Sequence, residues 1–300
     1  MIIYHIKWIS MKISHKFKTR ITSVWGFFGI TFLFSWILWF TIAILSPLAE
    51  PWNIILTILA AFAPTFAAIF LIVFFSDSET KKDFWKRVIN FKRIKRNWYI
   101  ISLVLFPILI SLAFLIYYLI GGNFPPLDGL MEAIQSPLSF IGFIVVIILG
   151  GPLAEELGWR GYALDPLIKR RKPLKASVIL WVIWAIWHLP LSFIPATPQN
   201  TIGFWISYWT WFIQVIALTV IITWIYKKNN RSIIIAIFLH FMSNLTFSLI
   251  IPIFTPSGYE IPVNADIILT ILHVLIAVII VLFIGKDVFL QKKVENVKEI

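Results

Sequence analysis

The stretch from Val24 to Ser46 reads VWGFFGITFLFSWILWFTIAILS and contains no charged residue. A helix that crosses a bilayer needs about 20 consecutive apolar residues, so this stretch is long enough to span a membrane. A basic segment precedes it, but the stretch is too long for the apolar core of a signal peptide and has no clear small-residue cleavage site. We therefore expect it to remain in the protein as a membrane anchor.

Similar apolar stretches recur along the rest of the chain. We predict spans at 24–46, 54–76, 98–120, 138–165, 174–193, 202–226, 232–251 and 266–285. Hydrophobic residues make up 60% of the chain and charged residues only 13%, whereas a soluble domain usually carries about 25% charged residues. The absence of Cys excludes a disulfide framework and a thiolate metal site. The sequence therefore predicts an all-α, polytopic membrane bundle of about eight helices.

Lys and Arg are confined to alternate connections between these spans. All but one of the 26 Lys and Arg residues lie before the first span, at 77–97, at 169–175, at 227–231 or after residue 285. The other connections hold acidic residues only, namely Glu50, Asp128, Glu132 and Glu260 among others. Because basic residues stay on the cytoplasmic side of membrane proteins, we expect both termini in the cytoplasm. The net charge of +12 then faces anionic headgroups rather than nucleic acid.

This pattern divides the chain into three segments. We expect a basic cytoplasmic segment at 1–23, an eight-helix membrane domain at 24–285 and a cytoplasmic tail at 286–300. The Ile-, Lys- and Phe-rich composition without large loops is typical of a bacterial protein. We expect a multi-pass protein of the cell membrane, with the lipid bilayer as its main partner.

The basic connection at 77–97 allows two interpretations. It can form a short interfacial helix with Phe84 and Trp85 in the lipid. Alternatively, it is a solvated connector without regular contacts to the membrane. The sequence does not decide between them.

The remaining cation, Arg160, lies inside the fourth span, in the sequence GGPLAEELGWR from Gly150 to Arg160. Each charged side chain at the centre of a membrane helix costs about 2.5–3.5 kcal/mol on insertion scales, so Glu155, Glu156 and Arg160 require a reason. Glu156 and Arg160 are four residues apart, in the order that favours an ion pair on one helix face. Glu155 is rotated by about 100° from Glu156. We infer that one carboxylate is neutralised structurally while the other is free for chemistry.

The backbone is interrupted just before these charges. Gly150-Gly151-Pro152 breaks the span because Pro lacks an N–H and clashes with the preceding turn. A helix that restarts near Pro152 places both carboxylates close to its N-terminus, where the helix dipole favours their charged forms. Broken helices at membrane depth are tolerated where they line a cavity, so we expect a cavity beside this break.

Three more polar residues lie in apolar runs, namely His188, His240 and Asn244. His240 and Asn244 are four residues apart and share one helix face. The basic residues Lys169, Lys172 and Arg231 mark the cytoplasmic ends of the three spans. Counted from them at about 1.5 Å per residue, these three residues and Glu155 all lie about 14–24 Å along their helices. This common depth predicts that they converge on one site. We interpret His273 and Gln214, in later spans, as a packing residue and an interhelical contact.

The residue types in this set favour hydrolysis by water. A carboxylate with an imidazole can deprotonate a water molecule. A second His with an Asn on the same face offers donors to a developing oxyanion. The chain has neither a nucleophile elbow around Ser or Cys nor a His-Glu-x-x-His string. Attack of water on a carbonyl group is therefore the reaction that fits best.

These motifs together resemble those of a known family. They are Glu155-Glu156-x-x-x-Arg160, an aromatic residue four positions before His188, and His240-x-x-x-Asn244. They resemble the motif set of the CPBP family, which contains the CAAX prenyl endopeptidases and the bacterial Abi-type intramembrane proteases. The match covers about residues 138–250, in the family's order and on successive spans.

The resemblance implies an intramembrane endopeptidase of the glutamate type, in an eight-helix bundle around a conical cavity that opens to the cytoplasm or the membrane. It implies that Glu155 with His188 activates the attacking water and that His240 with Asn244 forms the oxyanion site. Glu156 and Arg160 are implied to shape and charge-balance the site.

The implied substrates are peptides or proteins, processed in CAAX-like reactions, peptide maturation or bacteriocin self-immunity. The sequence departs from the family pattern at Trp184, where the family usually has Phe. The packing around His188 is therefore expected to differ.

Three alternatives remain open at this stage. Glu155, His188 and His240, together with Glu156, could supply a zinc site, whereas the water-only mechanism requires no cofactor. The same buried acids and His residues could form the relay of a proton-coupled transporter, although the sequence shows no inverted repeat. The chain could also be a non-catalytic immunity protein.

Overall fold

A computed structural model describes residues 15–45, 52–125, 128–194, 204–250 and 261–290. Within these ranges all regular structure is helical, as the sequence predicts. The longer or span-forming helices are α3 (Val24–Leu45), α4 (Trp52–Ala61), α5 (Ala63–Phe75), α7 (Arg96–Leu119), α9 (Pro137–Gly150), α10 (Pro152–Gly158), η2 (Trp159–Ala163), α11 (Leu164–Arg170), α12 (Pro173–Trp187), η3 (Leu189–Phe193), α13 (Phe204–Lys228), α14 (Ile233–Ile250), α15 (Val263–Ile279) and η5 (Ile280–Ile284). The shorter ones are α2 (His15–Ile21), α6 (Ser78–Ile89), η1 (Phe91–Arg93), α8 (Asp128–Gln135) and α16 (Lys286–Phe289).

The protein is a multi-pass membrane bundle. Within the described ranges, 6 helices are long and apolar enough to cross a membrane, or up to 7 if the bent pair α4–α5 forms one span. The shorter apolar helix Ile233–Leu249 falls where the seventh span is predicted. These segments follow one another in the predicted order, so the expected bundle of about eight helices is confirmed in outline. Residues 1–14 of the predicted N-terminal segment and residues 291–300 of the predicted tail lie outside the described residues, as do Glu50 and Glu260.

Two of the spans are broken. α4 and α5 meet at an angle of 48°, next to Pro64 at the start of α5. The fourth span runs from Pro137 to Arg170 but is interrupted at Gly151, where α9 ends and α10 begins, as the sequence predicts. About two turns later the chain passes through the π-helical turn η2 before α11 continues. Glu155 and Glu156 therefore lie between two irregular turns of one long span, and Arg160 lies within the second of them.

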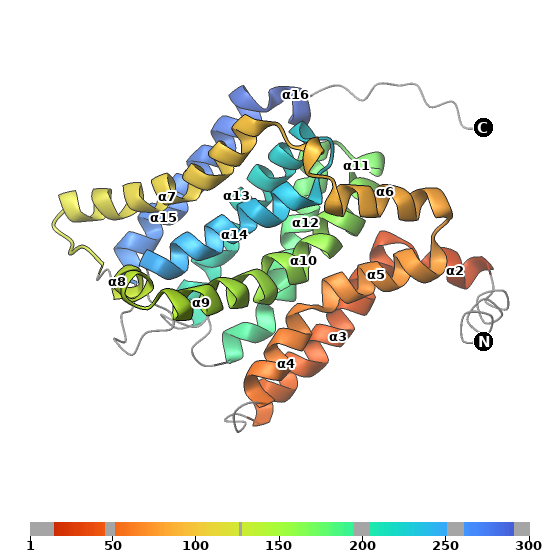
Figure 1. The fold of residues 1–300 in the computed structure, drawn as a ribbon, viewed down its shortest axis with the longest axis horizontal. Coiled ribbons are helices and arrows are strands. Elements are labelled where there is room, and N and C mark those ends of the chain that lie inside the picture. The colour runs from red at the N-terminus through yellow and green to blue at the C-terminus, as the bar shows by residue number, and fades with distance from the viewer. Residues whose placement is uncertain (1–14, 46–51, 126–127, 195–203, 251–260, 291–300) are drawn as a thin grey trace.

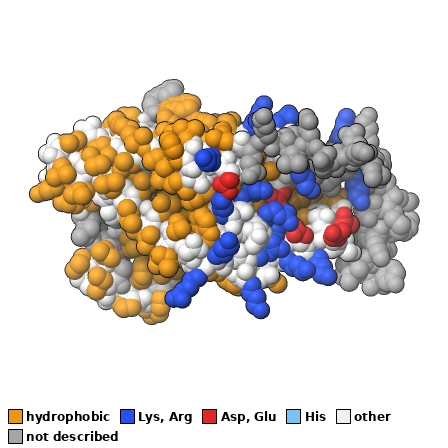
Figure 2. Space-filling view, turned by 90° about the horizontal axis from the view of Figure 1, so that it is seen from above, with side chains coloured by type: hydrophobic (Ala, Val, Ile, Leu, Met, Phe, Trp, Pro, Cys, Tyr) orange, Lys and Arg blue, Asp and Glu red, His pale blue; other side chains and the backbone are white. Residues whose placement is uncertain are grey.

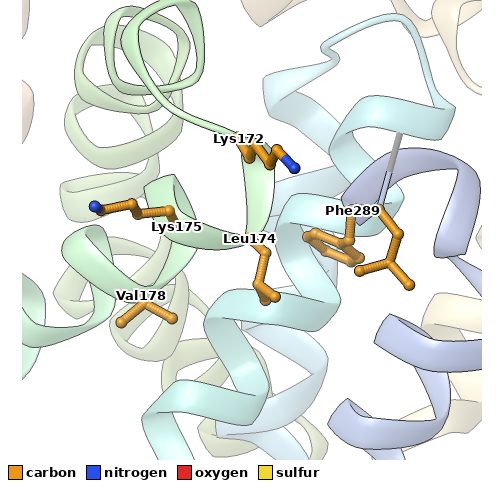
Figure 3. A pocket seen from close by; sticks show the side chains of 6 residues that line it. Lys172, Leu174, Lys175, Val178 and Phe289 are labelled. Carbon is orange, nitrogen blue, oxygen red and sulfur yellow. The ribbon is translucent and has the colours of Figure 1, made fainter. Parts of the chain in front are cut away.

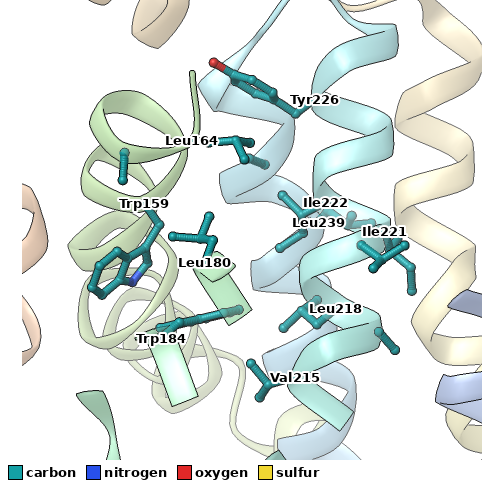
Figure 4. Packing of buried hydrophobic residues seen from close by; sticks show 14 of the residues in the cluster. Trp159, Leu164, Leu180, Trp184, Val215, Leu218, Ile221, Ile222, Tyr226 and Leu239 are labelled. Atoms are coloured by element: carbon teal, nitrogen blue, oxygen red, sulfur yellow. The ribbon is translucent and has the colours of Figure 1, made fainter. Parts of the chain in front are cut away.

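The helices form a central group with a layer on each side (Figure 1). α3, α4 and α5 pack together on one side, α7 and α15 lie on the other, and α10, α12, α13 and α14 lie between them. Figure 4 shows part of the central core, where Trp159, Leu180, Ile222 and Leu239 project from four different elements and are fully buried. Many apolar side chains on the outside of the bundle, by contrast, are strongly exposed, for example Leu138 at 83%. This arrangement surrounds α10 with protein on several sides.

The connection at 77–97 contains a helix, α6, which confirms the first of the two interpretations in part. Trp85 is exposed, as expected of an interfacial residue, but Phe84 is fully buried and the expectation that it dips into lipid is wrong. Phe84 instead packs beside Gly161 in η2. Phe84 therefore faces the bundle, whereas Trp85 and Ile89 of the same helix are exposed.

The basic connections share one face of the molecule. α6, α11 and α16 lie at the same end of the bundle in Figure 1, and Figure 2 shows Lys and Arg side chains gathered on this face. Here the buried Arg87 donates hydrogen bonds of 2.9 Å to Asp83 and to the Gly161 carbonyl. Arg231 bridges Asp83 and Asp165 at 2.8 Å each. These pairs tie α6 and the start of α14 to the span that carries the charged motif.

Candidate active site

Glu155 and Glu156 lie on α10, immediately after the helix break. Pro152 stands in the first turn, where its missing N–H costs nothing, and Glu155 is also in that turn. The two Glu side chains are buried, with 4% of Glu155 and none of Glu156 exposed. Two carboxylates are therefore held inside the bundle on adjacent positions of one short helix.

Glu156 is neutralised by two donors. Arg160 donates to Glu156 Oε1 at 2.6 Å, and His240 Nδ1 lies 2.9 Å from the same oxygen. The Arg160 guanidinium also lies over the Trp184 ring, 4.7 Å from its centroid. The predicted i, i+4 pair is confirmed, and it leaves Glu155 without a cation among its hydrogen-bond partners.

Glu155 is held by two indole groups through one of its oxygens. Trp184 Nε1 donates to Glu155 Oε2 at 2.5 Å, and Trp159 Nε1 donates to the same atom at 3.3 Å. The other oxygen, Oε1, is 3.9 Å from His188 Nε2. That separation is too long for a direct hydrogen bond, yet one water molecule can reach both atoms.

His188 is oriented by the end of its own helix. α12 ends at Trp187, and the backbone N–H of His188 turns to the carbonyl of Ala185. The Trp184 carbonyl is thereby free to bind the His188 ring, whose Nδ1 lies 3.0 Å away. Because a carbonyl only accepts, Nδ1 carries the proton and Nε2 of the neutral ring presents its lone pair toward Glu155.

Asn244 lies one turn after His240 on α14, against the helix break. A Cβ atom added to Gly151 would approach Asn244 Nδ2 to 2.9 Å. Gly at this position therefore leaves room for the Asn244 amide beside the backbone that precedes Glu155. The structure brings Glu155 and His188 together and joins His240 to Glu156, with Asn244 at the edge of the same group.

The two Trp donors were not identified from the sequence. Trp159 follows Glu155 by four residues, so helical spacing alone could have indicated a contact. Trp184 precedes His188 by four residues and was noted only as a departure from the family pattern. Its contact with Glu155 joins two helices, and no spacing within one helix signals it.

The two other polar residues singled out in the spans, His273 and Gln214, have partners outside this group. His273 places Nδ1 2.8 Å from the Leu269 carbonyl and stacks on Phe106, in agreement with its interpretation as a packing residue. Gln214 donates to Asp266 at 2.8 Å and to Thr270 at 2.9 Å, which confirms the predicted interhelical contact.

The zinc alternative does not fit the described residues. Among them no group of three or more His, Cys, Asp or Glu side chains is arranged to hold a metal ion. Glu155, His188 and His240 therefore do not form such a group. Glu155 and His188 face each other across 3.9 Å, while His240 binds Glu156 instead. The donors are thus divided between two carboxylates rather than directed at one point.

A pocket of about 340 Å³ lies elsewhere, between the start of α12 and α16 (Figure 3). Lys172, Leu174, Lys175, Val178, Phe289 and Leu290 line it. None of the residues predicted for the site contributes to this pocket.

Comparisons with known proteins give a consistent result. The model of the family described as type II CAAX prenyl endopeptidase Rce1-like matches residues 137–246, which contain all six motif residues. The chain is also similar to CAAX prenyl protease 2 of the archaeon Methanococcus maripaludis. The two are 32% identical over 284 residues, which cover 93% of this chain and 98% of the relative.

Proposed function

The chain belongs to the Rce1-like family of type II CAAX prenyl endopeptidases, intramembrane proteases of the glutamate type, and we propose how its own residues carry out the hydrolysis. The observation that carries the proposal is the facing pair of Glu155 Oε1 and His188 Nε2, 3.9 Å apart. The proposed activity needs no cofactor.

We assign water activation to this pair. Both atoms accept hydrogen bonds, since His188 Nδ1 is already engaged with the Trp184 carbonyl. A water molecule between them donates both of its protons and directs a lone pair of its oxygen toward the substrate carbonyl. As the oxygen bonds to the carbonyl carbon, one water proton passes to the pair. The same proton then protonates the leaving amine when the C–N bond breaks.

We assign the developing oxyanion to His240 and Asn244. His240 Nδ1 is directed at Glu156, which only accepts, so Nε2 is a donor when the ring is an imidazolium. The Asn244 amide, one turn further along α14, supplies a second donor. Fixed donors aimed at a developing charge contribute strongly to catalysis in a site shielded from water.

We propose a C-terminal CAAX-like sequence with a prenylated Cys as the substrate. The support for this is the relative's name, CAAX prenyl protease 2, and its similarity along nearly the whole chain. Substrate would approach from the basic face of the bundle, which we assign to the cytoplasm together with both termini. Peptide maturation would use the same chemistry on an unprenylated chain.

The test is cleavage by the full chain in detergent or liposomes, with matched prenylated and unprenylated CAAX peptides. Glu155→Gln and His188→Ala should abolish cleavage while the melting temperature stays close to that of the wild type. His273→Ala is the matched control, because His273 is also a buried membrane His whose Nδ1 binds a carbonyl of its own helix. Cleavage by Glu155→Gln at the wild-type rate would overturn the proposal.

Two further comparisons separate the alternatives. Cleavage that persists in the presence of a zinc chelator supports the water-only mechanism, whereas activity lost with a chelator and restored by zinc contradicts it. Equal cleavage of the prenylated and unprenylated peptides would assign the enzyme to general peptide maturation instead of CAAX processing.

A further inference from the structure

Trp184 contacts four of the charged or titratable side chains of the site, namely Glu155, His188, Arg160 and His240. Its indole N–H donates to Glu155, its carbonyl binds the His188 ring, and its own ring lies under Arg160. The same ring packs edge to face against His240, with the centroids 5.3 Å apart. The side chain is buried, with 1% exposed, so these contacts are not exchanged with solvent.

We propose that Trp184 is a positioning residue that sets the catalytic geometry of Glu155 and His188, an inference that rests on the proposed function. Trp184 donates only to Glu155 Oε2, at 2.5 Å, and Trp159 donates to the same oxygen. The hydrogen bonds leave Oε1 as the oxygen that faces His188. Trp184 thus determines which lone pairs of the carboxylate remain for water.

The backbone of Trp184 orients the second member of the pair. Its carbonyl fixes Nδ1 as the protonated nitrogen of His188, and this directs the Nε2 lone pair toward Glu155. One residue therefore fixes the carboxylate through its side chain and the imidazole through its main chain. Both hydrogen bonds involve Trp184, in the last turn of α12. They therefore hold Glu155 Oε1 and His188 Nε2 at a defined separation.

The indole N–H is the part of Trp184 that no other apolar residue can supply. Phe, the residue that the family usually has at this position, keeps the carbonyl and an aromatic ring but removes the donor, so in this chain only the longer hydrogen bond from Trp159 would hold the Glu155 carboxylate. A hydrogen bond to a charged group is worth about 1.5–3 kcal/mol, which corresponds to a rate effect of about 10- to 100-fold when the bond is needed for the reactive geometry.

The experiment measures kcat and KM of the full chain in detergent with the prenylated peptide. Trp184→Phe should lower kcat by about 10- to 100-fold and leave KM within about 3-fold of the wild-type value, because the donor acts on the carboxylate and not on substrate binding. Trp159→Phe should have a smaller effect in the same direction, since its bond to Glu155 is longer, at 3.3 Å.

Trp181→Phe is the matched control. Trp181 lies on the same helix and also donates its indole N–H, at 2.7 Å, but to the carbonyl of Phe212. The same substitution there removes one hydrogen bond and the same ring atoms without touching Glu155. Its kcat should equal that of the wild type. A decrease in kcat for Trp181→Phe as large as that for Trp184→Phe would overturn the inference.

If Trp184→Phe does not fold, 3-benzothienylalanine introduced at position 184 decides the matter, because it keeps the bicyclic shape and lacks the N–H. If this isostere has the wild-type kcat while Glu155→Gln is inactive, the role of Trp184 is overturned and the proposed function stands. Cleavage by Glu155→Gln would instead overturn the proposed function. Lowered kcat for the isostere at unchanged melting temperature supports the inference.

Discussion

Arg160 donates a hydrogen bond of 2.6 Å to Glu156, and neither side chain is exposed. Removal of one member of such a buried pair leaves the other charge without compensation and costs about 3–5 kcal/mol. Arg160→Ala should therefore lower the melting temperature and the folded yield as well as activity. The measurement is thermal unfolding in detergent together with the yield of monodisperse protein.

A double variant separates charge from packing at this pair. Glu156→Gln combined with Arg160→Met removes both charges and should recover part of the stability that Arg160→Ala loses. Wild-type yield and melting temperature for Arg160→Ala would show that the pair has no structural role.

Gly151→Ala should impair catalysis more than folding. The added methyl group would lie 2.9 Å from Asn244 Nδ2, so the amide must move away from the helix break. If Asn244 is the oxyanion donor that we propose, its displacement lowers the rate by about 10- to 100-fold, and kcat of the variant measures this. Gly142→Ala in α9 is the control, since no heavy atom lies within 4 Å of its added Cβ. Equal kcat values for the two variants would contradict the assignment of Asn244.

Gly158→Ala should destabilise the protein. Its Cβ would lie 2.5 Å from Pro64 Cβ and 2.6 Å from the Pro64 carbonyl, so α5 would have to move away from α10. Overpacking of this kind costs about 1–3 kcal/mol. Gly29→Ala in α3 meets nothing within 4 Å and should melt at or above the wild-type temperature, because Ala favours a helix. The prediction fails if the two variants unfold at the same temperature.

Arg87→Ala should be costly although Arg87 belongs to the basic face and not to the proposed hydrolytic pair. The Arg87 side chain donates to the Gly161 carbonyl and to the Asp83 carboxylate, each at 2.9 Å, and the substitution removes both hydrogen bonds. We expect a loss of about 3 kcal/mol in the free energy of unfolding. Lys228→Ala removes a pair with Asp287 whose side chains are 33% and 48% exposed, and should change stability by less than about 1 kcal/mol. Denaturant titration of both variants compares the two losses directly.

The features that depend on local spacing could be predicted from the sequence. Hydropathy located the spans, and the interval of four residues predicted the Glu156–Arg160 pair. The common depth of four polar residues predicted that helices from different parts of the chain converge. Glu155 and His188 do face each other, with reactive atoms 3.9 Å apart.

The contacts between helices that the sequence did not predict depend on how each helix is rotated about its axis. The indole of Trp184 reaches Glu155 because α12 turns that residue toward α10, and no pattern within α12 encodes that rotation. The burial of Phe84 has the same origin. An amphipathic pattern identifies the apolar face of α6, but it does not tell lipid from protein as the surface that this face meets.

The π-helical turn Trp159–Ala163 sets the angular phase between the two ends of the fourth span. Such a turn accommodates one residue more than an α-helical turn, and one residue corresponds to about 100° of rotation. Deletion of a single residue there would turn Asp165 away from Arg231, or else turn Glu156 away from His240. A change of length in this turn would thus break one of these contacts even where every motif residue is retained.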